Sequence, residues 1–455
     1  MVSAVLFITF FVLLVLNVPI SVCLGLSSAA AILYSGTSLT IVATNIYSGI
    51  SKFLLLAIPF FVLSGNIMAK AGISTRLIRF VDTCVGHRKG GIANVCIIVA
   101  CFFGAISGSG PATVAALGAV LIPAMIERGG FSAAFSTALM ATSSSIAIVI
   151  PPSIAFVVYA SITGVSIGDM FMAGIIPGIL MGLALVVVVM LEVRRNHVVP
   201  SNVEKASAKE RWNAFKDAFW GFLMPVIILG GIYGGIFTPT EAAAVSVVYG
   251  LFVGMIIYKE VKFKDLWEIL IDSAKTTGGI MLIVACASLF SFVCTRFGIS
   301  TAASELLARV AGNQFTFLLI CNIIFLIAGC FIDANSAMYI FIPIMLPVCK
   351  ALGYNVIAFG IMATVNLAIG QVTPPVGVNL FVAIGIKLRD GIRVTLQEIS
   401  RAVVPMVAAS IVVLLIITYI PQISTCLPAA LGSAAAIENG ETAGGDSGTT
   451  QTDND

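Results

Sequence analysis

Charged side chains are scarce in this chain. Only 10% of its 455 residues are Asp, Glu, Lys or Arg, whereas about 25% is usual for a soluble domain. Hydrophobic residues make up 59%. A water-soluble fold of this size could not bury so much apolar surface and still present a polar exterior. The sequence therefore predicts an integral, multi-pass membrane protein.

Several functional signatures are missing as well. The chain has two histidines, both in basic loops, no Cys-x-x-Cys pair and no Walker motif, which argues against zinc, redox or ATP-dependent chemistry. A serine hydrolase would need a base near Ser107 or Ser109. An intramembrane aspartyl protease would need two carboxylates, and only Asp333 lies well inside an apolar segment. We therefore expect no enzyme, no cofactor and, without a basic stripe, no nucleic-acid partner.

Long apolar segments follow one another along the chain, and several reach or exceed the roughly 20 residues of one membrane-spanning helix. They are residues 1–16, 20–33, 53–69, 92–126, 131–163, 167–193, 219–237, 240–258, 276–297, 315–351, 355–386 and 403–421. Four of them contain helix breakers, at Ser107 to Pro111, Pro151-Pro152, Asp333 to Ser336 and Thr373 to Gly377. We interpret the first and third breaks as tips of re-entrant helical hairpins, and the Pro-Pro pairs as interruptions of discontinuous helices.

The two halves of the chain resemble each other. Gly72-Ile-Ser-Thr returns at Gly298, Met140-Ala-Thr returns at Met362, and Pro151-Pro152 returns at Pro374-Pro375. The matches keep their order and an offset of about 224 residues, as an internal repeat would. Any one of these short matches is weak, but chance does not readily give several in one register.

The repeats divide the chain into four parts. Residues 1–193 are predicted to form the first repeat, 194–218 a cytoplasmic linker, 219–421 the second repeat and 422–455 a disordered polar tail.

Basic residues orient the repeats. Arg194 and Arg195 follow the last apolar segment of the first repeat, whereas Lys387, Arg389 and Arg393 precede that of the second. Because cytoplasmic loops are enriched in Lys and Arg, the same segment runs inward in one repeat and outward in the other. We therefore predict an inverted repeat, with the linker inside and both termini outside, as in many secondary transporters.

Polar and small residues gather at the four breaks. At membrane depth, non-helical backbone needs surrounding protein or a water-filled cavity. Its freed carbonyls suit sodium, and half-helix N-termini suit an anion. The predicted sodium and substrate site comprises Ser107, Gly108, Ser109, Gly110, Ser143, Ser144, Ser145, Pro151, Asp333, Asn335, Ser336, Thr373, Pro374, Gly377 and Asn379, with sodium at Ser107, Ser109, Asp333, Asn335 and Thr373. The alternative is that these residues only let helices pack closely.

Two charged residues and one basic stretch need separate interpretation. Asp333 is a functional candidate because an intramembrane carboxylate is costly, but it could instead cap the returning half-helix. Glu241, after Thr238-Pro239, indicates a helix start. The stretch from Lys262 to Lys275 is typical of an interfacial amphipathic helix.

The motifs resemble one family. Gly-Ser-Gly-Pro-Ala-Thr-Val-Ala-Ala at 108–116, the Pro-Pro pair at 151–152, Thr-Pro-Thr-Glu-Ala-Ala-Ala at 238–244 and Pro-Pro-Val-Gly at 374–377 are similar to the large membrane subunit of tripartite ATP-independent periplasmic (TRAP) transporters. The resemblance runs from about residue 5 to residue 421.

The resemblance implies an elevator mechanism, sodium coupling and a place in the bacterial inner membrane, in contact with lipid. It also implies two partners: a small four-helix permease subunit, expected to be a separate chain, and a periplasmic solute-binding protein that delivers an organic acid. Which acid is carried is left open. A one-component sodium/dicarboxylate-type symporter is the alternative, and a channel is a more distant one.

Overall fold

The structure is a computed structural model, and it describes residues 1–195, 205–388 and 393–432. Every regular element in this part of the chain is a helix, which confirms the predicted all-α class. Nine of the described helices are long and apolar enough to cross a membrane, as a multi-pass protein requires.

The helices of the first half are α1 (Val2–Val15), α2 (Ile20–Tyr34), α3 (Thr40–Ile50), η1 (Phe53–Leu56), α4 (Ala57–Lys70), α5 (Ile73–Val85), α6 (Gly91–Ser107), α7 (Gly110–Glu127), α8 (Ala133–Ser145), η2 (Ile146–Ile148), α9 (Ile154–Thr163) and α10 (Ile167–Arg195). Those of the second half are α11 (Ala208–Tyr233), α12 (Pro239–Leu251), η3 (Phe252–Ile257), α13 (Phe263–Arg296), α14 (Ile299–Ala311), α15 (Gln314–Phe331), α16 (Ala334–Ala351), α17 (Val356–Gly370), α18 (Val378–Ile384), α19 (Leu396–Tyr419) and α20 (Gln422–Ala430).

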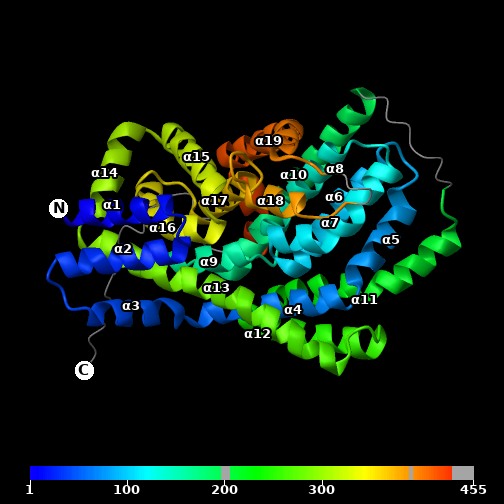
Figure 1. The fold of residues 1–455 in the computed structure, drawn as a ribbon, viewed down its shortest axis with the longest axis horizontal. Coiled ribbons are helices and arrows are strands. Elements are labelled where there is room, and N and C mark those ends of the chain that lie inside the picture. Colours follow the sequence, from blue (N-terminus) through cyan, green and yellow to red (C-terminus); the bar gives the residue numbers. More distant parts are fainter. Residues whose placement is uncertain (196–204, 389–392, 433–455) are drawn as a thin grey trace, which may run out of the picture.

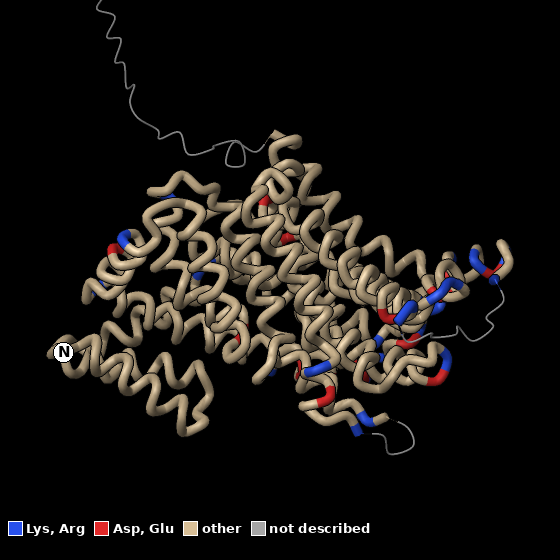
Figure 2. Tube along the Cα trace, turned by 90° about the horizontal axis from the view of Figure 1, so that it is seen from above, with Lys and Arg blue, Asp and Glu red and all other residues tan. Residues whose placement is uncertain are grey.

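Charge is unevenly distributed over the molecule. Figure 2 shows few charged residues in its broad middle, and Lys, Arg, Asp and Glu gathered mainly toward the end opposite the N-terminus. A middle with few charges is what a lipid environment demands, because charged side chains are costly at the bilayer centre.

Two helical hairpins stand out in the fold. α6 turns back into α7 at Gly108 and Ser109, and α15 turns back into α16 at Ile332 and Asp333. The helices of each hairpin pack against each other. In Figure 1 the first hairpin lies on the right and the second on the left, with α17 and α18 between them. The breaks predicted at these positions are therefore tight turns between helices.

Each hairpin is followed by an interrupted helix. α8 gives way to η2 and Pro151-Pro152 before α9 begins, and α17 ends at Gly370, shortly before Pro374-Pro375 and α18. Both Pro-Pro bonds are cis. Because proline lacks the N–H that a continuing helix needs, the helices stop here, and the two predicted discontinuities are confirmed.

α13 is a single helix of 34 residues. It packs against α2, α3 and α4, and also against α16 of the second hairpin, and it runs through the middle of the view in Figure 1. The stretch from Lys262 to Lys275, predicted to form an interfacial amphipathic helix, is therefore helical but forms the first part of one long helix. No proline interrupts the stretch after Lys275, so the helix continues into the apolar segment.

N-terminal capping boxes explain where two further helices begin. Thr238 and Glu241 form a capping box at the start of α12, which confirms the interpretation of Glu241 as a helix-start residue. Ser207 and Glu210 form another capping box at the start of α11. The helix therefore begins at Ala208, inside the predicted linker 194–218 and before the predicted start of the apolar segment at 219, because this cap stabilises a polar first turn.

The predicted disordered tail also needs correction. Its first residues form α20 (Gln422–Ala430), which packs against α10 and α17. This short helix buries Ser424, Thr425 and Pro428, so it has a packed face. The prediction for the tail beyond residue 432 falls outside the described residues.

Candidate functional site

A cavity of about 380 Å³ lies between the two hairpin turns. Its wall includes Gly108 to Pro111 from the first turn, Asp333 to Asn335 from the second, and Gln371 after α17. Lys275 and Thr276 of α13 form another side. The structure thus brings together two turns that lie far apart in the sequence, together with the break that follows α17.

The first turn presents an uncapped helix N-terminus to the cavity. Ser109 occupies the N-cap position of α7, but its side chain makes no capping hydrogen bond. Gly108 has a φ of 60°, and a Cβ there would lie 2.9 Å from the carbonyl oxygen of Pro152. Glycine suits both this conformation and this close approach. Without a cap from Ser109, the N–H groups of Gly110 and Ala112 are open to a ligand, whereas Pro111 between them has no N–H to donate.

A hydroxyl pair supports this turn from inside. The hydroxyl of Ser107 lies 2.9 Å from that of Thr113 on α7, and the Thr113 hydroxyl donates to the carbonyl of Ser109 at 2.8 Å. Ser107 is largely buried. The pair fixes the turn, and its oxygens are of the kind that a hard cation accepts.

The second turn is capped by a carboxylate. Asp333 Oδ2 accepts hydrogen bonds from the backbone N–H groups of Asn335 at 3.0 Å and Ser336 at 3.1 Å. Its Oδ1 accepts the hydroxyl of Ser336. The capping role considered for Asp333 is therefore present. Oδ2 already accepts two hydrogen bonds, but Oδ1 accepts one, so a second lone pair on Oδ1 is left for a cation.

The break after α17 touches both turns. The backbone N–H of Gly377 donates to the carbonyl of Cys330, just before the second turn, at 3.3 Å. Asn379 is fully buried, and a Cβ on Gly110 of the first turn would lie 2.7 Å from its Nδ2. Within the described residues, neither polar atom of the Asn379 side chain has a hydrogen-bond partner. An amide buried in this way is costly unless a ligand or water satisfies it.

The serines at the end of α8 lie elsewhere. Ser143, Ser144 and Ser145 are fully buried, and none of them lines the cavity between the turns. The hydroxyls of Ser144 and Ser145 donate to carbonyls of their own helix at 2.6 and 2.7 Å. The Ser143 hydroxyl has no partner among the described groups. The structure therefore does not place this cluster together with the first turn in one cavity.

Seven other predicted residues also stay off the cavity wall: Ser107, Pro151, Ser336, Thr373, Pro374, Gly377 and Asn379. The Thr373 hydroxyl donates to the carbonyl of Ile369 at 2.8 Å. Pro374 is part of the cis pair before α18. Pro151 lines an apolar groove of about 490 Å³ between α6, α10 and α11. The groove suits lipid chains or a hydrophobic surface, but not an ion.

Lys275 and Thr276 line the cavity, and the sequence interpretation assigned neither of them to the site. Lys275 marked the end of a predicted interfacial helix, whereas in the structure it belongs to the continuous α13. A signal was available: Lys275-Thr-Thr-Gly-Gly opens an apolar segment. One charge followed by small and hydroxyl residues at a membrane boundary can mark a polar cavity.

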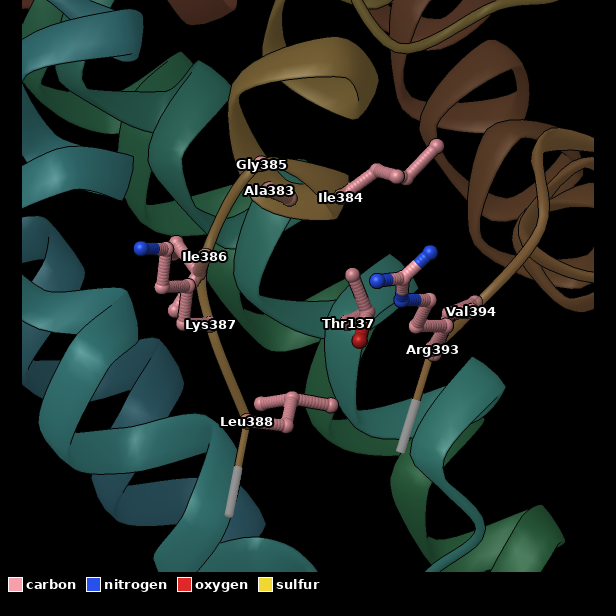
Figure 3. A pocket seen from close by; sticks show the side chains of 9 residues that line it. All are labelled: Thr137, Ala383, Ile384, Gly385, Ile386, Lys387, Leu388, Arg393 and Val394. Atoms are coloured by element: carbon pink, nitrogen blue, oxygen red, sulfur yellow. The ribbon is translucent and has the colours of Figure 1, made fainter. Parts of the chain in front are cut away.

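A second cavity, of about 400 Å³, lies beyond the end of α18. Residues 383–388, Arg393, Val394 and Thr137 of α8 line it. In Figure 3 the Arg393 side chain extends toward the cavity near Thr137, while the ammonium of Lys387 points to the opposite side. None of the predicted site residues lines it. Its basic residues are among those that oriented the predicted repeats.

Comparison with known proteins gives a consistent family. The model described as "Tripartite ATP-independent periplasmic transporter, DctM component" matches residues 7–423. A Rhodobacter capsulatus protein, named C4-dicarboxylate TRAP transporter large permease protein DctM, is 38% identical over 436 residues, which cover 92% of this chain and 97% of that protein. The isethionate TRAP transporter permease protein DctMQ of Oleidesulfovibrio alaskensis is 40% identical over 420 residues, covering 92% of this chain and 65% of that protein.

A solved structure shares the fold. The YdaH transporter of Alcanivorax borkumensis superposes with a TM-score of 0.59 at 14% sequence identity, over 86% of this chain and 88% of that one. A similarity at this identity concerns the architecture and not the substrate.

Proposed function

Because the chain belongs to the DctM-component family of tripartite ATP-independent periplasmic transporters, we propose that it is the sodium-coupled permease through which a small organic anion enters a bacterial cell. It acts as the large subunit in the inner membrane, beside a small four-helix subunit. A periplasmic solute-binding protein delivers the anion. The observation that carries the proposal is the cavity lined by both hairpin turns.

The architecture of the proposed permease is an inverted repeat that works as an elevator. The order of helices supports this: α6 to α10 and α15 to α19 each run as a hairpin, a helix broken by Pro-Pro, and a long closing helix. Helices of the two halves also contact each other in a reciprocal way: α2 of the first half packs on α13 of the second, and α12 of the second half packs on α4 of the first. In such repeats, substrate and ion sites lie where the broken helices meet.

The substrate class is a small organic anion with a carboxylate or sulfonate group. Support comes from the α7 N-terminus, because uncapped N–H groups and the helix dipole favour negative charge. The chain is about equally identical to a relative named for a C4-dicarboxylate and to one named for isethionate, a sulfonate. Overall identity therefore does not choose between the two acid groups.

Sodium is the proposed coupling ion, at two sites related by the repeat. One site uses Ser107 and Ser109 at the first turn, and the other uses Asp333, Asn335 and Thr373 at the second. The second set supports the proposal better, because it includes a carboxylate and because Asn335 Oδ1 has no partner among the described groups. Oxygen ligands replacing the hydration shell are what such an ion requires.

Uptake into proteoliposomes tests the proposed function. The chain, its small subunit and the binding protein are reconstituted together, and succinate and isethionate are offered as substrates. We expect uptake that needs both partners and an inward sodium gradient. Sodium-independent uptake contradicts the coupling, and robust uptake by the chain alone favours a one-component symporter instead.

Thiol labelling tests the inverted topology. Ser38, between α2 and α3, and Ser207, just before α11, are exposed loop residues that the predicted topology puts on opposite sides of the membrane. A Cys426→Ser background removes the exposed native thiol. An impermeant reagent added from the periplasm should label Ser38→Cys and miss Ser207→Cys. Labelling of Ser207→Cys alone overturns the orientation.

A further inference from the structure

The cavity between the turns holds a positive charge that none of the sodium or substrate assignments uses. Among the described residues that line it, Lys275 is the one cation. Its side chain is 73% exposed, and its ammonium lies 3.5 Å from the Asp272 carboxylate on the preceding turn of α13. An exposed contact at this distance holds a lysine only weakly. The ammonium is therefore free to turn toward a ligand.

Another part of the cavity wall is suited to a negatively charged group. The N-terminus of α7 lies there without a side-chain cap from Ser109, and the buried Asn379 amide adjoins it at Gly110. Gln371 also lines the cavity, is only 6% exposed, and has an Oε1 without a partner among the described groups. Amide oxygen and nitrogen positions are interchangeable in assignment, so the Gln371 side chain can offer N–H donors to an anion in the cavity.

The second turn makes the cavity asymmetric. The N-terminus of α16 is already occupied by the carboxylate of Asp333, which accepts both of its leading N–H groups. A second anion there would meet like charge. An anionic group is therefore favoured beside α7, and Lys275 is the cation among the described residues that line the same cavity.

We propose that Lys275 is a specificity-determining residue that binds the second acid group of a dicarboxylate, while the first acid group lies at the N-terminus of α7. This assignment rests on the proposed function. An ammonium can donate charge-assisted hydrogen bonds to a carboxylate, and its flexible stem lets it reach acids of different length. A substrate with one acid group gains nothing from Lys275, so the residue separates dianions from monoanions.

Chemical protection tests the contact without requiring transport. The full chain, purified with its small subunit in sodium-containing buffer, is treated with a limiting amine-acylating reagent, and the acylation of each lysine is followed by mass spectrometry. Succinate should slow acylation of Lys275 at least about fivefold, and isethionate less than about twofold, with exposed Lys264 on the same helix unchanged. Equal rates with and without succinate, or equal slowing by both anions, overturn the proposal.

Variants then test the role in transport. Lys275→Gln should raise the KM for succinate uptake about tenfold with kcat nearly unchanged, whereas Lys275→Arg and the control Lys264→Gln should stay within about threefold of the wild type. If melting curves show that Lys275→Gln does not fold, Lys275→Arg decides: a tenfold rise in its KM rejects the proposal. Protection without any wild-type uptake rejects the proposed function alone, and uptake with an unchanged KM in Lys275→Gln rejects the role of Lys275 alone.

Discussion

The two hairpin turns have the same topology but opposite electrostatic character. At the first, Gly108 and Ser109 lead into a helix whose N-terminus lacks a side-chain cap from Ser109. At the second, Asp333 occupies the corresponding place and accepts hydrogen bonds from the first N–H groups of α16. The N-terminus of α7 is thus open to an anion, while that of α16 already carries a carboxylate, which makes the second turn the better suited of the two proposed sodium sites.

The difference shows how an internal repeat can serve two ligands. Both turns reach one cavity, so their unlike charges stand close together. An anionic substrate and a coupling cation bound there would each lower the cost of binding the other, which is the thermodynamic basis of coupled transport. Duplication supplies the geometry, and a few substitutions at the turns supply the division of roles.

The largest expected effect comes from closing the space at the first turn. Gly108→Ala should abolish uptake and lower the free energy of unfolding by about 2–5 kcal/mol, because it adds left-handed strain and a Cβ contact with the carbonyl of Pro152. Gly164 is the matched control, since its φ is +81° and a Cβ there would meet nothing within 4 Å. Gly164→Ala should cost only about 1–2 kcal/mol and keep uptake. If both variants lost similar amounts of unfolding free energy and of uptake, the first turn would have no special role in transport.

A smaller effect is expected from the buried amide beside that turn. Asn379→Leu should lower uptake about tenfold while leaving stability unchanged or higher, because an unpartnered buried amide costs roughly 1–3 kcal/mol. Asn366 provides the contrast, since its Nδ2 donates to Oδ1 of Asn322. Asn366→Leu leaves the buried Asn322 Oδ1 without this hydrogen bond and should therefore destabilise the protein. The melting temperature and the uptake rate of each variant are measured. A lower melting temperature with normal uptake in Asn379→Leu would show that Asn379 has only a structural role.

The smallest expected effect is on stability, when the N-cap side chain of each turn is removed. Asp333→Ala should lower the free energy of unfolding by about 0.5–2 kcal/mol, the usual cost of losing an N-cap. Ser109→Ala should change it by less than about 0.5 kcal/mol, since that side chain makes no capping bond. Denaturation of the purified protein in detergent measures both. Equal losses would mean that the turns are capped alike.

Local signals account for what the sequence predicted well. Gly108 and Asp333 end one helix and begin another through their own conformation and side chain, so both turns could be located without tertiary information. The Pro-Pro pairs interrupt helices for an equally local reason. The all-α membrane class follows from composition.

The remainder depends on packing between distant segments. Whether Lys275 ends an interfacial helix or enters a cavity depends on the continuity of α13 and on its contact with α16. Asn379 and Gly110 come from different halves of the chain, and no sequence pattern near either residue predicts their contact. The buried face of α20 likewise exists only because α10 and α17 are beside it.

The sodium dependence of Asp333→Asn tests the central claim, that the second turn binds the coupling ion through its charge. Asparagine is also a good N-cap, so the variant keeps the turn but removes the carboxylate. In proteoliposomes we expect the half-saturating sodium concentration to rise about tenfold for Asp333→Asn and about twofold for Ser109→Ala, with similar melting temperatures. An unchanged half-saturating concentration in Asp333→Asn would show that Asp333 is only a cap and would contradict the charged sodium site.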